Sequence, residues 1–173
     1  MIRKAMQSDI DQIVEIYDEI FTEDEKRETP QVGWKRGIYP TRETAEKSLA
    51  IGELFVEEDN GKIVSCGRIN QDQAIEYKDA NWEFDALDSE VMVLHTLVVL
   101  PSAPKKGYGS NFVRFYEDFA RENNCKFLRL DTMATNKNAR AFYKKHGFNE
   151  VGFIDSDFNG IGIVKLVCLE KKL

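Results

Sequence analysis

Residues 97–110 read Leu-Val-Val-Leu-Pro-Ser-Ala-Pro-Lys-Lys-Gly-Tyr-Gly-Ser, and this stretch decides the fold. Its apolar, β-branched start predicts a strand, and the loop that follows carries a basic pair and Gly-x-Gly before an expected helix. The first N–H groups of that helix have no intrahelical partners and lie at its positive end. The stretch therefore predicts a binding site for a phosphate-bearing ligand.

The glycine pattern narrows the kind of phosphate site. Gly107-x-Gly109 lacks the third glycine of a Rossmann dinucleotide fingerprint, and it lacks the Gly-Lys-Ser/Thr of a P-loop. Both of these nucleotide-binding folds therefore fit poorly. For this stretch taken alone, a glycine-rich turn without a ligand remains the alternative.

A second stretch adds a family resemblance. Residues 136–148 read Asn-Lys-Asn-Ala-Arg-Ala-Phe-Tyr-Lys-Lys-His-Gly-Phe. Together the two stretches resemble the GCN5-related N-acetyltransferase (GNAT) superfamily. Its first signature is Leu-x-Val-x-x-Pro followed by Gln/Arg-x-x-Gly-x-Gly/Ala, and its second is Asn-x-x-Ala-x-x-Phe/Leu-Tyr-x-x-x-Gly-Phe. The second signature is complete here, whereas the first departs at Pro104, where the family usually has Gln or Arg.

The resemblance implies the α/β fold of the GNAT acyl-CoA N-acyltransferases, in which helices flank a central mixed sheet. A length of 173 residues is typical of one domain, so we expect a single GNAT domain over residues 1–173. The pattern of apolar residues predicts strands at residues 2–5, 54–57, 62–69, 91–99, 127–131, 151–154 and 163–169. It predicts helices at residues 8–21, 41–51, 107–123 and 136–146, and this order of elements is the family's order.

Two segments stand out between these elements. The run at residues 91–99 is almost wholly apolar, which is typical of a central strand buried on both faces. Residues 70–90 form a long, acidic connection with several aromatic residues. Connections of this length inside a compact domain are uncommon and are often functional.

Composition and charge limit the function classes. Hydrophobic residues make up 42% of the chain and charged residues 31%, as in an ordinary globular protein. No apolar run reaches transmembrane length and no signal peptide is visible, so we expect a cytoplasmic protein with no membrane partner. The net charge of −6 argues against nucleic acid as a partner. Cys66, Cys125 and Cys168 lack metal-ligand spacing, so we expect buried thiols and no metal site.

The resemblance implies acetyl-CoA as the acyl donor. Its pyrophosphate would bind the backbone N–H groups at the start of the helix, in the segment Lys105, Lys106, Gly107, Tyr108, Gly109 and Ser110. Pro104 has no N–H to contribute, so we expect weaker or differently shaped binding there. The strand end at Leu97, Val98 and Val99 would pair with the pantetheine arm. The Leu97 N–H would polarise the thioester carbonyl.

Two residues of the second signature also receive roles from the resemblance. Asn136 would donate or accept a hydrogen bond with the pantetheine arm, and it is also placed to cap a helix. Tyr143 would act as the general acid that protonates the departing thiolate. The alternative for Tyr143 is a helix tyrosine that only packs on the core.

The general base is left open between several groups. His95 lies two residues before Leu97, so in a regular strand the two side chains share a face. Some family members, including arylalkylamine acetyltransferases, carry a His here that helps deprotonate the amine, and His titrates near neutral pH. A buried core histidine is the alternative reading. Glu90, Asp131 or a chain of water molecules are the other candidates.

Substrate recognition is expected on the variable segments. Trp34 and Tyr39 lie in residues 22–40, and Tyr77 and Trp82 lie in residues 70–90 among acidic residues. Aromatic walls with carboxylates suit a cationic amine. The alternative is that these aromatic residues only hold long connections against the core.

The resemblance implies transfer of an acetyl group from acetyl-CoA to a primary amine of a small molecule or peptide. The amine would attack directly in a ternary complex, without a covalent enzyme intermediate. One alternative is a related domain that binds acyl-CoA without turnover, which the departure at Pro104 favours. Another is the transfer of a larger acyl group. A homodimer is possible, since the family often dimerises.

Overall fold

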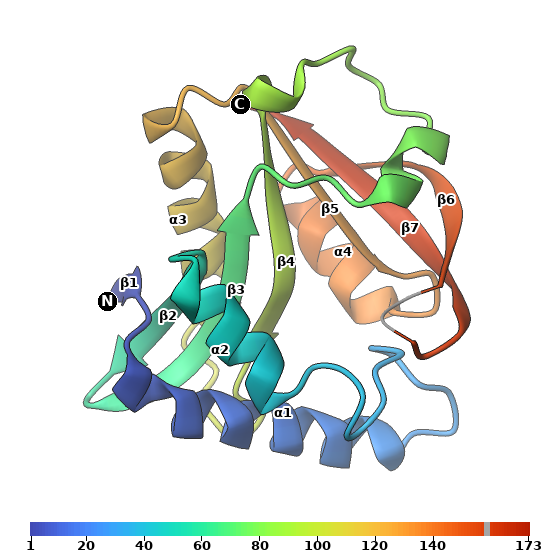
Figure 1. Cartoon of the computed structure of the whole chain (residues 1–173). Coiled ribbons are helices and arrows are strands. Elements are labelled where there is room, and N and C mark those ends of the chain that lie inside the picture. The colour runs from blue at the N-terminus through green and yellow to red at the C-terminus, as the bar shows by residue number, and fades with distance from the viewer. Residues whose placement is uncertain (158–159) are drawn as a thin grey trace.

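The protein is built on one seven-stranded sheet, seen in a computed structural model that describes residues 1–157 and 160–173 (Figure 1). The strands lie in the order β1-β2-β3-β4-β5-β7-β6, and all neighbours are antiparallel except β4 and β5. This mixed sheet confirms the predicted fold class. The strands are β1 (Ile2–Lys4), β2 (Leu54–Asp59), β3 (Lys62–Asn70), β4 (Val91–Val99), β5 (Phe127–Met133), β6 (Asn149–Asp157) and β7 (Ile163–Lys172).

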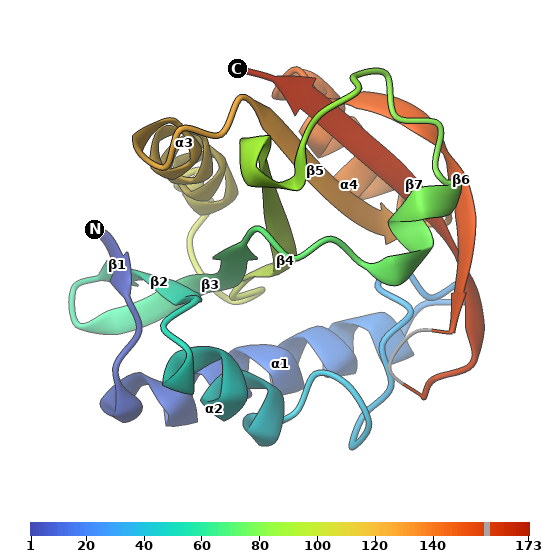
Figure 2. The same cartoon turned by 45° about the horizontal axis from the view of Figure 1, so that its top comes forward.

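Helices cover both faces of the sheet (Figure 2). The α-helices are α1 (Ile10–Glu25), α2 (Arg42–Ala50), α3 (Tyr108–Glu122) and α4 (Lys137–Lys145). Residues of α1 and α2 pack with one core cluster, and residues of α3 and α4 pack with another on the opposite face. The predicted order of strands and α-helices is confirmed. Three short 3-10 helices, η1 (Gln7–Asp9), η2 (Ile75–Asp79) and η3 (Asp88–Glu90), were not predicted.

The first half of β4 is the centre of the core. Met92 and Leu94 pack in the cluster that includes Phe112 of α3. Val91 and Val93 alternate with them and pack on the other face. All four side chains are buried, so the prediction of a strand enclosed on both faces holds for residues 91–94, whereas 95–97 and 99 are half-buried.

The second half of β4 contains a β-bulge that changes which way the side chains point. Cys66 pairs with Val98 and Arg68 pairs with His95, so two residues of β4, Thr96 and Leu97, face one residue of β3. Thr96 has a φ of +53°, in the left-handed region. The extra residue interrupts the two-residue alternation. Leu97 therefore packs with the α3 cluster, whereas Val98 packs with the α1 cluster.

The residue opposite the bulge is a glycine for steric reasons. A Cβ at Gly67 would lie 3.0 Å from the Phe112 ring and 3.3 Å from the Leu94 side chain. The bulged backbone and α3 therefore approach each other across a position that leaves little room for a side chain.

A buried ion pair holds the long connection at residues 70–90. The Arg129 guanidinium lies 2.9 Å from Glu170 Oε1, and their side chains are 5% and 0% exposed. Glu170 Oε2 accepts hydrogen bonds from the N–H groups of Glu83 and Phe84, at 2.8 and 3.3 Å. Arg129 in turn donates to the Phe84 carbonyl and to Gln73. Both partners thus use their remaining hydrogen bonds to hold the connection at residues 70–90.

Replacing Glu170 with Gln should destabilise the protein strongly. The change leaves the Arg129 charge buried without its carboxylate, which costs about 3–5 kcal/mol in the free energy of unfolding. Denaturation by urea measures this loss. The matched control is Asp155→Asn in the exposed Asp155–Lys165 pair, whose N–O distance is 3.9 Å and whose side chains are 64% and 63% exposed. The control should leave stability unchanged, and an equally stable Glu170→Gln variant would contradict the account.

Candidate active site

The strands β4 and β5 separate like the arms of a V (Figure 1). They pair only from Val91 to Val93 on β4, against Phe127 to Arg129 on β5. Beyond that point β4 continues to pair with β3, and β5 continues to pair with β7. The inner edges of the two strands are therefore left without a strand partner where they diverge.

A pocket of about 120 Å³ lies at the divergence. Leu97 of β4, Asn136 at the start of α4 and Tyr143 within α4 all line it. The structure thus brings together the three residues to which the resemblance assigns thioester, pantetheine and proton-donor roles. Val98 is buried against α1 instead, so its side chain does not line this pocket.

The start of α3 has the expected anion-binding form. Its first intrahelical hydrogen bond runs from the Asn111 N–H to the Gly107 carbonyl, at 3.0 Å, so the N–H groups of Tyr108, Gly109 and Ser110 precede the helical ladder. Gly107 has a φ of +79°, which only glycine adopts easily, and it turns the chain into the helix.

The basic pair before α3 is partly used by the loop itself. The Lys106 N–H donates to the Pro104 carbonyl at 2.7 Å, and the Lys106 ammonium lies 2.9 Å from Asp59. The Tyr108 hydroxyl donates to the same Asp59 carboxylate at 2.6 Å. The expected row of donors from residue 105 onward is therefore interrupted at Lys106. The exposed Lys105 precedes the interruption, and the helix start follows it.

Asn136 and Tyr143 take the positions that their structural alternatives predict, a helix cap and a tyrosine packed in the core. Both residues also line the smaller pocket. Asn136 caps the helix, because its side-chain oxygen accepts the Ala139 N–H at 3.0 Å. Tyr143 is buried between Phe142 and Phe148, with ring centroids 5.1 and 5.5 Å away. Burial raises the pKa of the Tyr143 phenol well above its usual value, and the negative charge of Asp131 adds to the shift. The phenol stays protonated, as a proton donor must.

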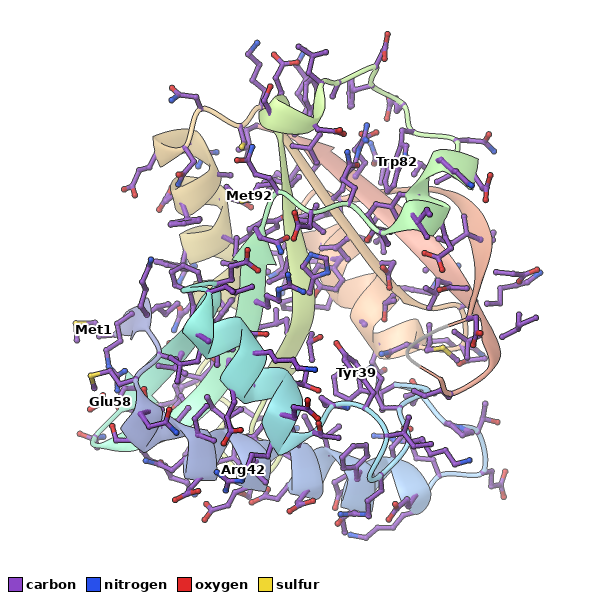
Figure 3. All side chains as sticks on the ribbon, in the orientation of Figure 1. Met1, Tyr39, Arg42, Glu58, Trp82 and Met92 are labelled. Atoms are coloured by element: carbon purple, nitrogen blue, oxygen red, sulfur yellow. The ribbon has the colours of Figure 1, made fainter. Side chains whose placement is uncertain are left out.

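A larger pocket of about 620 Å³ opens next to the first. Tyr39 and Tyr77 line it, with His95 of β4 and residues of α2. Figure 3 shows Tyr39 below the open end of the V. A hydrogen bond joins the Tyr39 and Thr96 hydroxyls and fixes the loop to the bulge.

The larger pocket is rich in carboxylates. Glu43, Glu76, Asp131 and Asp157 line it, together with the cations Lys47 and Arg68. Lys47 is bound to Glu43 at 2.8 Å, and Arg68 is bound to Glu53, outside the lining, at 2.7 Å. The positive charges of the lining are therefore already engaged by carboxylates, whereas Glu76 is held by the neutral Ser156 hydroxyl at 3.1 Å. This charge balance suits a cationic guest.

The two pockets share four lining residues, the apolar Leu94 and Leu166 and the polar Thr96 and Asp131. Asp131 lies on β5 beyond the point of divergence, and its Oδ2 accepts a hydrogen bond from the Tyr77 hydroxyl at 2.8 Å. Burial raises the pKa of the Asp131 carboxyl to about 6, with a smaller contribution from the charge of Glu76. The junction thus holds a carboxyl that titrates close to neutral pH.

His95 differs from its expected placement. Its side chain lines only the larger pocket, whereas the Leu97 side chain lines only the smaller one. The prediction that they share a face is wrong, because the bulge at Thr96 reverses the alternation. His95 Nε2 lies 2.9 Å from the Asn70 side-chain oxygen. Burial lowers the pKa of His95 to about 4, and the charge of Arg68 adds to the shift.

The remaining predicted residues divide between the pockets and the core. Trp34 lines the smaller pocket. Trp82 lies in the 70–90 connection, away from Tyr39 (Figure 3), and lines neither pocket. Its indole N–H donates to the Tyr77 carbonyl at 2.7 Å, and the Arg129 guanidinium lies over its ring. Glu90 also lies outside both linings and forms an ion pair with Lys126.

Comparison with known families decides the classification. Residues 10–148 match the model of the acetyltransferase (GNAT) family. The chain belongs to the GNAT family. Among curated GNAT relatives, the uncharacterized N-acetyltransferase YhfO of Bacillus subtilis is 35% identical over 65 residues, 37% of this chain. An uncharacterized N-acetyltransferase of Methanocaldococcus jannaschii is 25% identical over 152 residues, 86% of this chain. The matches span 44% and 60% of the lengths of these two relatives.

Solved structures show the same GNAT fold. A GNAT-family acetyltransferase of Streptococcus agalactiae has a TM-score of 0.82 at 19% identity, and the match covers 100% of this chain and 95% of that one. The Salmonella typhimurium protein yncA, solved with its cofactor acetyl-CoA, has a TM-score of 0.67 at 18% identity, covering 100% and 93% of the two chains. The likeness extends over the whole sheet and its helices.

His95 should titrate near pH 4 rather than near its usual value of 6.5. The pKa is lower in the folded protein than in the unfolded chain. Its contribution to stability is therefore present above about pH 6.5 and is lost as the pH falls through about 4. Proton NMR of the two imidazoles measures the midpoint, with His95→Gln assigning the signals. A midpoint of 6.5 for His95 would show that the imidazole is not held neutral by its surroundings.

Proposed function

We propose that this GNAT protein is an N-acetyltransferase that moves an acetyl group from acetyl-CoA to the primary amine of a small cationic molecule or peptide. The observation that carries the proposal is the meeting of two pockets of different character at Thr96 and Asp131. The smaller pocket holds the residues expected at the acyl donor. The larger pocket has tyrosines and an excess of carboxylates for an amine.

The residues present fit acetyl-CoA. The N–H groups at the start of α3 would bind the pyrophosphate, and Gly107 allows the backbone to turn toward it. The unpaired inner edge of β4 would receive the amides of the pantetheine arm, which extend like a strand. Acetyl-CoA supplies the activated thioester when it is bound. That yncA, with the same fold, was solved with acetyl-CoA also supports this donor.

Two groups of the chain would assist the transfer. The Leu97 N–H follows the bulge on β4 and would donate to the carbonyl oxygen where negative charge develops. Tyr143, whose phenol is protonated at neutral pH, would supply a proton to the leaving sulfur. Tyr143 is buried in the core cluster that includes α3, and Leu97 packs against the same cluster.

The lining of the larger pocket indicates the chemical class of the acceptor. An ammonium group is attracted by the carboxylates of Glu76 and Asp131 and by the ring of Tyr39. A cytoplasmic location and a homodimer remain expectations. Among residues 1–157 and 160–173, no helix combines the length and apolar character needed to cross a membrane.

Blocking the turn before α3 should abolish tight binding of acetyl-CoA. Gly107→Val places a β-branched residue at a φ of +79°, so the turn must rearrange and its N–H groups lose their alignment. Titration calorimetry should give a micromolar Kd for the natural protein and at least about a tenfold weaker Kd for the variant. Gly61→Val is the matched control, because Gly61 has a φ of +77° in the β2–β3 turn and neither glycine has a neighbour within 4 Å of its Cβ position.

The results of this titration and of an acetylation assay distinguish three explanations. Equal weakening in both variants would assign the effect to general destabilisation. Absence of binding in the natural protein would overturn the acyl-CoA proposal. A natural protein that binds acetyl-CoA tightly but acetylates none of a panel of mono-, di- and polyamines would favour the non-catalytic alternative.

Tyr143→Phe should slow the reaction without abolishing it. The variant removes the proton donor but keeps the ring between Phe142 and Phe148. A thiolate is already a good leaving group, so we expect kcat to fall only about tenfold, less than the roughly 10²–10⁴-fold typical of general acid–base catalysis. Steady-state kinetics with release of free thiol measures the change, and calorimetry should show unchanged binding of acetyl-CoA. An unchanged kcat would leave Tyr143 with a packing role alone.

A further inference from the structure

We propose that Asp131 is the general base that deprotonates the acceptor amine, an inference that rests on the proposed acetyltransferase function. A base for this reaction must reach the amine in its own pocket at the point where that pocket meets the acyl group. Asp131 lines both pockets. It lies on β5 just after β5 leaves β4, so it faces the junction from the side opposite the bulge.

The carboxylate is held by its neighbours in a fixed orientation. Oδ2 accepts the Tyr77 hydroxyl at 2.8 Å, and Tyr77 itself is fully enclosed beside Trp82. The Asp131 backbone is paired with Cys168 of β7. With Oδ2 occupied by Tyr77, we assign the accepted proton to the other oxygen, Oδ1.

The other candidate bases fail on position or on chemistry. His95 and Glu76 line only the larger pocket, so neither belongs to the junction with the smaller one. Glu90 lies outside both pockets in an ion pair with Lys126. Among the candidate bases that the structure describes, Asp131 alone belongs to both linings.

The electrostatic surroundings support the assignment. Several ionisable groups interact with Asp131 or share its pocket. They are Tyr77 and Glu76 of η2, Tyr39 of the loop before α2, Arg68 of β3, His95 of β4, Tyr143 of α4, Asp157 of β6 and Cys168 of β7. Burial dominates and raises the pKa of Asp131 to about 6, whereas the Tyr77 hydrogen bond lowers it. A carboxyl with this pKa is ionised at neutral pH and is a stronger base than an exposed aspartate.

The proton balance of the step is simple. An N–H bond of the substrate ammonium breaks, and Asp131 carries the proton as a carboxylic acid. The lone pair of the neutral amine then forms the amide bond to the acetyl carbon as the carbon–sulfur bond breaks, and Tyr143 protonates the sulfur. The nitrogen still carries one proton more than the amide does, and it releases that proton to water as the carbonyl re-forms. Asp131 afterwards releases its proton to water, and Tyr143 regains one from water. The overall reaction releases one proton.

The first test is Asp131→Asn, which preserves the shape of the side chain. We expect kcat to fall by at least about 10²-fold while the Kd of acetyl-CoA in calorimetry stays the same. The natural protein should show kcat/KM rising with pH through about 6, since Asp131 must be ionised to act. The Asn variant should lose this rise. Asp155→Asn, at an exposed aspartate on the edge strand β6, is the matched control and should keep both the rate and the pH profile.

The second test changes the pKa of the base without removing it. Tyr77→Phe deletes the hydrogen bond that lowers the pKa of Asp131, so the rise in kcat/KM should shift to higher pH. His95→Gln should leave the position of the rise unchanged. Carbon NMR of the carboxyl groups measures the titration midpoint of Asp131 without any turnover. If Asp131 only supported the structure, a change in this midpoint would not be accompanied by the same shift in the pH profile of kcat/KM.

Distinct outcomes overturn the two claims separately. If the natural protein acetylates amines and Asp131→Asn keeps its rate and pH profile, Asp131 is not the base although the proposed function stands. If the rise disappears in His95→Gln instead, the histidine is the base. If the natural protein neither binds acetyl-CoA nor acetylates an amine, the proposed function and this inference fail together.

Discussion

The divergence of β4 from β5 is the constraint on which the rest of the structure depends. Each strand keeps its partner on the outer side, β3 for β4 and β7 for β5, so the sheet remains intact on both sides of the opening. The inner edges lose their partners after Val93 and Arg129. Backbone N–H and C=O groups left in this way cost free energy unless water or a ligand pairs with them. An extended ligand rich in amides satisfies that requirement better than a compact one.

The bulge at Thr96 turns this opening into a junction between two pockets. One extra residue on β4 directs Leu97 toward α3 and α4 and leaves His95 on the face that α1 and α2 cover. Thr96 itself lies in both linings, and its hydroxyl is bound to Tyr39. Leu97 therefore lines the smaller pocket, while the side chain of its neighbour Thr96 holds the Tyr39 loop beside the larger one.

The sequence predicted the parts of the fold that depend on local pattern. The order of strands and helices, the burial of residues 91–94 and the cap at Asn136 each follow from residues close together in the chain. The bulge could not be predicted, because Thr96 is β-branched and its neighbours read as a regular strand; the assumed alternation then placed His95 on the wrong face. Trp82 was expected in the substrate pocket for a related reason. Its partner Arg129 is itself placed by Glu170, 41 residues further along the chain, and no local pattern encodes that contact.

The same burial acts in opposite directions on the two ionisable groups that were candidates for one task. Removing water disfavours charge, so it lowers the pKa of His95 to about 4 and raises that of Asp131 to about 6. The histidine, whose usual pKa suits base catalysis, is moved away from neutral pH, and the aspartate is moved toward it. A pKa in water is therefore a poor guide to how either residue titrates in this fold. Burial is the largest cause of both shifts; the charge of Arg68 adds to it for His95, whereas the Tyr77 hydrogen bond opposes it for Asp131.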